Sequence, residues 1–249
     1  IIGKLIPAFR NFSNCIFASS GEPDILSEFN IESVTSSWLD LNPDFYNFFQ
    51  TNVSGTSLIY ELIIKHNLKI SKILIASTQF IYGDGNWECE IHGKFNAECR
   101  QIENLRKSNW DIKCPVCNSV CLYIENVETI SNPSNHYSLS KYFQEQLAIK
   151  LGKLYKIPTV ALRYSIVHGS RQSLKNTYSG LLRNFAISID NNIELDTFED
   201  NMMLRDYVSV LDVASANLMA IESTSTDYEI YNVGGGVGYT PKDIAELLS

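Results

Sequence analysis

Apolar runs alternate with helical stretches along most of this chain, and this alternation constrains the fold more than any other feature. The segments 72–77, 159–165 and 229–234 are short, continuous and mostly apolar. Apolar side chains recur at helical spacing in residues 58–63 and, over a longer span, in residues 139–154. Parallel strands covered on both faces have continuous apolar sequences, and the helices between them supply the cover. The pattern predicts an α/β fold with a doubly wound parallel sheet.

The start of the last helix is marked by two residues. Thr240 belongs to the residue types that cap helix starts, and Pro241 suits the first helical position because its φ angle is already helical. We therefore expect a helix over residues 241–248.

Composition and charge argue against two classes of function. The 249 residues carry a formal net charge of −8 with acidic and basic side chains interspersed, which disfavours a non-specific nucleic-acid binder. No run of about 18 apolar residues occurs, so no membrane-spanning segment is predicted. The opening residues lack a signal-peptide pattern, and we expect a cytoplasmic protein.

Residues 84–132 interrupt the alternation with polar, cysteine-rich sequence. Five of the six cysteines lie between positions 89 and 121. Two short chelating pairs occur here, Cys89 with His92 and Cys114 with Cys117. Two such pairs complete the closed tetrahedral shell of a structural zinc ion, so we predict an inserted zinc-binding loop. Cys121 could replace one ligand, Cys99 has no obvious partner, and unligated thiols in a flexible loop are the alternative.

Tyr137 and Lys141 are the first candidates for chemistry. Residues four apart on a helix lie on one face, so the phenol and the ammonium can reach the same ligand. A nearby cation lowers the pKa of a phenol from about 10, and a value near 7 requires about 4 kcal/mol of differential stabilisation. Tyr137 could then act as a general base. A chance pair on a helix surface is the alternative.

Thr78 follows the predicted strand 72–77, at its carboxyl end. Open α/β sheets bind ligands at the carboxyl ends of their strands. The Thr78 hydroxyl could hydrogen-bond the substrate oxygen whose proton Tyr137 removes, or it could satisfy local backbone groups instead.

Six motifs occur in one order along the chain. They are Asn52-Val-Ser-Gly-Thr56, Ser77-Thr-Gln-Phe-Ile-Tyr-Gly83, Asn135-His-Tyr-Ser-Leu-Ser-Lys141, Leu162-Arg-Tyr-Ser-Ile-Val-His-Gly169, Arg205-Asp-Tyr-Val-Ser-Val-Leu-Asp-Val-Ala214 and Tyr231-Asn-Val-Gly-Gly235. With them the sequence resembles the extended short-chain dehydrogenase/reductases, specifically the NAD-dependent nucleoside-diphosphate-sugar epimerases and dehydratases. The cysteine-rich insert further resembles that of the dTDP-L-rhamnose 4-epimerase group.

This resemblance implies a Rossmann-like fold, NAD as cofactor, a nucleoside-diphosphate sugar as substrate, and a homodimer. The implied catalytic residues are Thr78, Tyr137 and Lys141. The implied cofactor-binding residues are Gly3, Asn52, Ser77, Tyr137, Lys141 and Tyr164. The implied substrate-binding residues are Thr78, Ser165, Asn176, Tyr178 and Arg205, with the arginine on the diphosphate. A structural zinc ion would be held by Cys89, His92, Cys114 and Cys117.

The expected activity is epimerisation at C4 of the sugar, through a transient 4-keto intermediate. Gln79 and Phe80 occupy the positions where dehydratases of this group carry an Asp-Glu pair, which disfavours dehydration. Ile166 replaces an asparagine of the group and removes a polar substrate contact. The alternatives are a reductase or other oxidoreductase on the same scaffold, and a catalytically impaired paralogue that binds nucleotide sugars.

The resemblance also implies a domain division. Residues 1–165 would form the NAD-binding core, with 84–132 as the zinc-binding insert, and residues 166–249 the substrate-binding region interleaved with remaining core elements. The glycine-rich fingerprint of a dinucleotide fold is absent, and Gly3 resembles its last glycine. We therefore expect the chain to be incomplete at both ends, with the second strand of the fold at residues 14–17.

Overall fold

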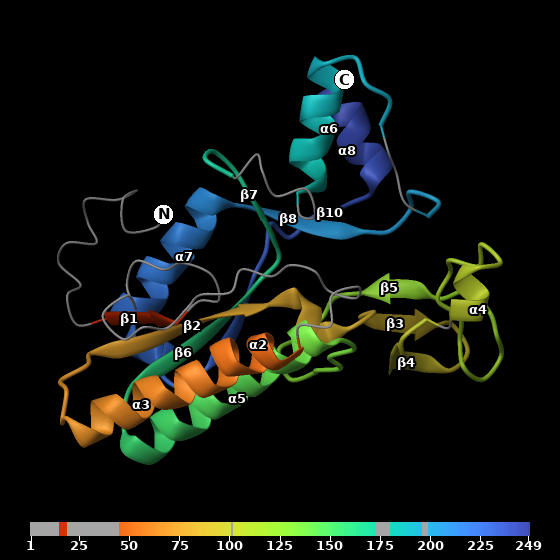
Figure 1. Cartoon of the computed structure of the whole chain (residues 1–249). Coiled ribbons are helices and arrows are strands. Elements are labelled where there is room, and N and C mark those ends of the chain that lie inside the picture. Colours follow the sequence, from red (N-terminus) through yellow and green to blue (C-terminus); the bar gives the residue numbers. More distant parts are fainter. Residues whose placement is uncertain (1–14, 19–44, 101, 173–179, 196–198) are drawn as a thin grey trace. The chain divides into compact units, whose positions relative to one another are not determined.

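The computed structural model describes residues 15–18, 45–100, 102–172, 180–195 and 199–249 (Figure 1). The chain divides into two compact units. The first unit consists of the segments Ile1–Ile81, Asn135–Tyr164 and Leu211–Val233. The second unit consists of Tyr82–Ser134, Ser165–Val210 and Gly234–Ser249. Each unit is therefore assembled from stretches that are far apart in the sequence.

The first unit is built on a parallel sheet. Among the described residues it has four strands in the order β1-β2-β6-β9, namely β1 (Cys15–Ala18), β2 (Lys72–Thr78), β6 (Thr159–Tyr164) and β9 (Ile230–Val233). All neighbouring pairs are parallel, and Thr78 lies beside Tyr164 where β2 and β6 end. The three predicted apolar strands are confirmed, and the strand expected at 14–17 begins one residue later.

Helices cover both faces of this sheet (Figure 1). The helices of this part of the chain are α2 (Phe45–Phe49), the π-helix η3 (Gln50–Ser54), α3 (Gly55–Lys65), the 3-10 helix η4 (Gln79–Tyr82), α5 (His136–Tyr155), α7 (Val210–Glu222) and the 3-10 helix η5 (Thr224–Thr226). On one face, α3 and α5 pack against Ile73 and Ile75 of β2. On the other, Leu74 of β2 packs against Ala220 and Ile221 of α7. Because successive strand residues point to opposite faces, this confirms the doubly wound α/β class.

Helix α5 buries a different face from the one that its apolar residues predicted. Phe143 and Leu154, two of the expected core residues, are 47% and 69% exposed. The fully buried side chains of this helix are instead mostly polar or charged, among them Ser140, Lys141 and Glu145. Buried polar groups are tolerated only with hydrogen-bond partners, and here those partners come from other elements. The sequence predicts the helix correctly but not its buried face.

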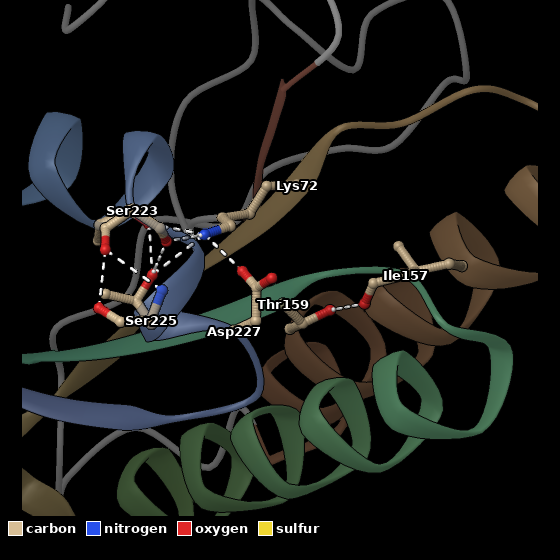
Figure 2. A network of polar contacts seen from close by, with 8 residues as sticks. Lys72, Ile157, Thr159, Ser223, Ser225 and Asp227 are labelled. Carbon is tan, nitrogen blue, oxygen red and sulfur yellow. Dashed lines mark hydrogen bonds and ion pairs between the residues drawn. The ribbon is translucent and has the colours of Figure 1, made fainter.

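A buried lysine joins the start of β2 to the end of α7 (Figure 2). Lys72 is 4% exposed, and its Nζ donates to the backbone oxygens of Ala220 at 3.0 Å and Ser223 at 2.6 Å. It also donates to Thr226 Oγ1 at 3.1 Å and lies 2.6 Å from Asp227 Oδ1. A cation at a helix C-terminus satisfies carbonyls that lack helical partners. Lys72 is therefore structural, at the strand end opposite to Thr78.

The second unit contains two small sheets in the part that the structure describes. In the insert, β3 (Asn86–Cys89), β4 (Gly93–Asn96) and β5 (Leu122–Ile124) form an antiparallel sheet in the order β4-β3-β5. The short helix α4 (Ile102–Leu105) lies between β4 and β5 in the sequence. The second sheet has the order β10-β8-β7, from β7 (Ile166–His168), β8 (Arg205–Ser209) and β10 (Gly238–Tyr239). Its core joins Phe185 of α6 (Leu181–Asp190), Tyr207 and Ile244 of α8 (Pro241–Leu248).

The last helix, α8, begins where the sequence predicts. The Thr240 hydroxyl accepts a hydrogen bond from Asp243 N at 3.1 Å, and Asp243 Oδ2 accepts one from Thr240 N at 2.8 Å. This reciprocal capping box, with Pro241 in the first turn, satisfies backbone donors that have no helical partner. None of the helices that the structure describes is long and apolar enough to cross a membrane.

Candidate active site and metal centre

The first turn of α5 is held by its own cap. Asn135 Oδ1 accepts a hydrogen bond from Ser138 N at 2.8 Å, and Ser138 Oγ accepts one from Asn135 N at 3.1 Å. This capping box fixes the residue at which the helix begins. Tyr137 lies inside this turn, so the cap also sets the direction of its side chain.

Thr78 and Tyr137 meet at the carboxyl end of β2. Thr78 lies close enough to the Tyr137 hydroxyl to lower the pKa of this phenol. The Tyr137 ring packs edge-on against Phe48 of α2 and Phe80 of η4, with ring centroids 5.6 and 6.1 Å away. Thr78 Oγ1 also accepts a hydrogen bond from Phe80 N at 3.3 Å, so this hydroxyl serves the local backbone as well. The structure thus brings two of the three predicted catalytic side chains close together.

The acidity of Tyr137 in the protein alone differs from the sequence-based expectation. Desolvation of its hydroxyl raises the pKa of Tyr137 above its ordinary value, and the proximity of Thr78 offsets only part of that rise. Lys141 was expected to lower this pKa, but its charge is directed to other partners. Without ligands, the protein therefore holds a neutral phenol at pH 7.

Lys141 lies one turn further along α5 and is buried. Only 2% of the residue is exposed, and its Nζ donates to the backbone oxygen of Ala76 and to Gln144 Oε1, both at 3.0 Å. Burial lowers the pKa of Lys141 to about 7, because the ammonium loses its hydration. Lys141 is thus positioned between β2 and its own helix.

Asn52 and Ser77 are both buried next to α5. Asn52 lies in the π-helix η3 and donates from Nδ2 to Ser140 Oγ at 2.9 Å. Its Oδ1 is buried and has no hydrogen-bond partner in the described part of the chain. π-Helical turns often occur at functional sites, and a buried unsatisfied oxygen is a group with capacity for a ligand or water. The Ser77 hydroxyl, in contrast, donates to Glu145 Oε2 at 2.8 Å.

The side chain of Tyr164 lies in the core of the first unit. It donates to Asn217 Oδ1 of α7 at 2.7 Å, and burial raises the pKa of this phenol further above its ordinary value. Its ring packs against the cluster formed by β2, β6 and α7. What remains near Thr78 is the Tyr164 backbone, in register across the two strands.

Two predicted substrate contacts lie in the second unit. The Ser165 hydroxyl donates to the backbone oxygen of Asp206 at 2.8 Å. Arg205 is the first residue of β8 and is partly exposed, and its pKa is lowered by burial of the guanidinium. Three other predicted residues, Gly3, Asn176 and Tyr178, lie outside the described residues.

The four predicted metal ligands converge in the insert. One ligand atom from each of Cys89, His92, Cys114 and Cys117 lies within 4.8 Å of the others. Cys89 Sγ is 3.6 Å from both His92 Nδ1 and Cys117 Sγ, and Cys114 Sγ is 3.4 Å from His92 Nδ1. A tetrahedral ion with bonds of about 2.3 Å to sulfur and 2.0–2.1 Å to nitrogen separates its ligands by roughly 3.5–3.8 Å. The arrangement fits zinc.

The other thiols of the insert lie outside this set. Cys121 is buried in the same cluster as Cys89, and its Sγ donates to the backbone oxygen of Ser119 at 3.4 Å. Cys99 is exposed. Hydrogen bonds from Ser119 hold the pKa of the Cys117 thiol down to about 6. Cys121 is therefore a neighbour of the four ligands rather than one of them.

A large part of the chain matches a known protein family. The model of the "NAD dependent epimerase/dehydratase family" matches residues 91–234, which is more than half of the chain. The chain belongs to this family. The match spans Tyr137, Lys141 and Arg205, so it covers three of the six sequence motifs described above and all but the last residue of a fourth.

Relatives within the epimerase/dehydratase family include sugar-nucleotide epimerases. The chain is 26% identical over 198 residues to dTDP-L-rhamnose 4-epimerase of Burkholderia thailandensis, covering 80% of this chain. It spans 53% of that relative, about half its length. UDP-glucose 4-epimerase of Thermotoga maritima, solved with UDP-glucose, aligns with a TM-score of 0.61 at 24% identity, over 96% of this chain and 62% of that one. UDP-glucuronic acid 4-epimerase of Bacillus cereus, solved with UDP-glucuronic acid and NAD, aligns with a TM-score of 0.60 at 23% identity, over 88% and 55%. The structural likeness confirms the Rossmann-like fold.

The sequence analysis did not identify the buried polar side chains that hold α5 in place. Glu145 forms a buried bidentate ion pair with Arg163 of β6, at 3.0 Å to Nε and 2.7 Å to NH2. Gln144 donates to Thr56 Oγ1 of α3 at 2.9 Å. A signal was present, because polar residues at 140, 141, 144 and 145 follow the helical spacing of a single face.

Proposed function

We propose that this protein is an NAD-dependent epimerase that inverts C4 of a nucleoside-diphosphate sugar through a transient 4-keto intermediate. The observation that carries the proposal is the proximity of Thr78 and Tyr137 at the carboxyl end of β2, with the buried Lys141 ammonium bonded to Ala76 O of the same strand. Parallel α/β sheets bind their ligands at this edge. Membership of the epimerase/dehydratase family supports the same reaction class.

In this proposal Tyr137 takes the proton of the sugar C4 hydroxyl, and Thr78 holds that oxygen by a hydrogen bond. The proton returns from Tyr137 after the keto-sugar presents its other face. Lys141 stabilises the phenolate through its positive charge. The aromatic rings of Phe48 and Phe80 exclude water from the Tyr137 ring, which strengthens these interactions.

Two side chains of this chain have polar groups that could bind the nicotinamide end of NAD. When bound, NAD supplies the hydride acceptor that protein side chains lack. Lys141 uses two of its three N–H groups on acceptors in the described part, and Asn52 Oδ1 has none of its capacity used there. Ser77 and Tyr164 use their hydroxyls within the protein, so we propose that they contribute through the backbone. Gly3 remains a prediction for the dinucleotide phosphates.

The other proposed substrate contacts belong to the second unit. We propose that Arg205 binds the diphosphate, because a guanidinium forms bidentate hydrogen bonds with phosphate oxygens. Ser165, Asn176 and Tyr178 are proposed sugar contacts. We accordingly propose residues 166–249 as the substrate-binding region and 84–132 as an insert in the NAD-binding core, 1–165.

The positions after Thr78 favour epimerisation over dehydration. Elimination of water from a sugar requires an acid and a base beside the catalytic hydroxyl. Gln79 cannot ionise, and Phe80 places its ring against Tyr137. No carboxylate therefore follows Thr78 in η4.

The experiment that tests this function separates the epimerase from its alternatives. The purified protein is supplied with NAD and, in turn, with UDP-glucose and dTDP-L-rhamnose. NMR should show the C4 epimer of one of them while the absorbance of NADH stays flat, because an epimerase returns its hydride. Stoichiometric consumption of NADH or NADPH with a keto-sugar identifies a reductase instead. Binding without any turnover identifies an impaired paralogue.

We further propose that Cys89, His92, Cys114 and Cys117 hold one structural zinc ion. A closed four-ligand shell leaves no position for a catalytic water. The purified protein should contain about one zinc per chain, and Cys89→Ala should lose it. Cys99→Ala is the matched control, because Cys99 is exposed and outside the cluster, and it should keep the metal. Elemental analysis decides; full zinc content in the Cys89 variant would contradict the proposed site.

We also propose a homodimer formed through α3 and α5. Both helices expose apolar side chains, including Leu58 at 38%, Ile64 at 41%, Leu154 at 69% and Tyr155 at 48%, and a shallow groove lies between them. A second copy would cover such a surface symmetrically. Leu154→Glu should give a monomer in analytical ultracentrifugation. Leu247 of α8 is equally exposed, and Leu247→Glu should leave the dimer intact. If both variants were dimers, or both were monomers, this surface would not be the dimer interface.

A further inference from the structure

Lys141 is held by one side chain that the proposed reaction does not use. Its Nζ has two acceptors in the described part of the chain, the backbone oxygen of Ala76 and Gln144 Oε1, both at 3.0 Å. The Ala76 oxygen belongs to β2 and cannot be removed by substitution. Gln144, three residues along the same helix, is therefore the side chain that defines where the ammonium lies.

The amide of Gln144 is fixed at both ends. The residue is 2% exposed, its Oε1 accepts from Lys141, and its Nε2 donates to Thr56 Oγ1 of α3 at 2.9 Å. A reversed amide would point its NH₂ group at the ammonium, donor against donor, and would lose the bond to Thr56. Thr56 thus selects the orientation in which Gln144 can hold Lys141.

We propose that Gln144 is a positioning residue that holds the Lys141 ammonium against the end of β2, one turn of α5 from Tyr137, with Thr56 fixing the orientation of its amide. The inference rests on the proposed function, in which Lys141 stabilises the Tyr137 phenolate. It extends that function because the Tyr-Lys pair alone does not determine where a flexible lysine side chain points. A neutral amide does this without neutralising the ammonium.

Few other charges act on Lys141. Glu145 of its own helix is paired with Arg163 of β6, so the two largely cancel. Tyr137 on α5 is the titratable group that Lys141 serves. The remaining titratable side chains on packed elements are Tyr46 of α2, Tyr60, Glu61 and Lys65 of α3, Lys72 of β2, Tyr164 of β6, and His136, Tyr142, Lys150, Lys153 and Tyr155 of α5. Lys72 and Tyr164 are bonded elsewhere. The carbonyl of Gln144 is thus the nearest adjustable influence on the ammonium.

Two opposite substitutions test the inference. Gln144→Leu removes an acceptor and should lower the pKa of Lys141 by about one pH unit, whereas Gln144→Glu adds an anion and should raise it by at least as much. NMR of the isotope-labelled lysine ε-methylenes measures this pKa directly, with Lys141→Met assigning the signal. Thr56→Val, which frees the other end of the amide, should shift it in the direction of Gln144→Leu but by less.

Activity provides a second, separate measurement. If the ammonium is the active form, the alkaline limb of the kcat profile moves down in pH for Gln144→Leu and up for Gln144→Glu. If the role of Gln144 were purely structural, both variants would be less stable. The two substitutions would then not shift the alkaline limb of the kcat profile, or the pKa of Lys141, in opposite directions. Unchanged Lys141 titration in folded variants overturns the inference. Opposite shifts of the pKa in a protein without epimerase activity would support the positioning role while refuting the proposed function.

Discussion

Replacement of Tyr137 by Phe should reduce kcat by about 10³-fold, the middle of the range for loss of a general acid–base group. The substitution removes one oxygen and keeps the ring that packs against Phe48 and Phe80, so the fold and the affinity for the nucleotide sugar should be retained. The loss should therefore appear in kcat rather than in KM. A coupled NMR assay of epimer formation, with calorimetric binding of the substrate, measures both.

Tyr142→Phe is the matched control for this prediction. It makes the same chemical change on the same helix, one position beyond Lys141, and should leave kcat within about twofold of wild type. Turnover within tenfold of wild type for the Tyr137 variant would remove the phenol from the mechanism. An equal loss in both variants would indicate damage to α5 instead.

The ionisation of Tyr137 can be followed in the protein without substrate. Because desolvation raises its pKa above the ordinary value of 10.0, the phenol should remain protonated throughout the neutral range. The ultraviolet difference between wild type and Tyr137→Phe should therefore contain no tyrosinate signal below pH 10. Such a signal near pH 7 would mean that Lys141 lowers this pKa without any ligand.

The sequence predicts those features that depend on local spacing. Continuous apolar runs predict β2 and β6, because a strand buried on both faces needs mostly apolar side chains along its whole length. The capping residue Thr240 predicts the start of α8, and the two short chelating pairs predict the cluster around Cys89, because each depends on neighbours within a few residues.

Features that depend on distant partners are not predictable in this way. The apolar stripe of α5 suggests a buried Phe143 and Leu154, yet polar residues take the buried face. They can do so because Ser140 meets Asn52 and Glu145 meets Arg163, contacts made only after the chain has folded. Hydrophobic periodicity contains no information on such partners, so it identifies the helix and assigns the wrong face.

Replacement of Glu145 by Leu should reduce the free energy of unfolding by about 3–5 kcal/mol, the cost of breaking a buried ion pair by removing one partner. Glu145 is fully buried and Arg163 is 2% exposed. The single substitution leaves the Arg163 guanidinium buried without its carboxylate, and it also removes the acceptor of the Ser77 hydroxyl. Urea unfolding followed by circular dichroism measures the loss.

Two further variants determine what the pair contributes. Glu246→Leu removes one partner of the exposed pair with Lys242 on α8, in which both side chains are 68% exposed, and should cost less than about 1 kcal/mol. The double variant Glu145→Leu/Arg163→Met should recover most of the stability lost in Glu145→Leu, because no uncompensated charge remains. If it recovers stability without recovering kcat, the pair sets the position of α5, and with it Tyr137 and Lys141, rather than the stability of the sheet. A single-variant loss no larger than that of Glu246→Leu would show that the buried charge finds other compensation and would contradict the prediction.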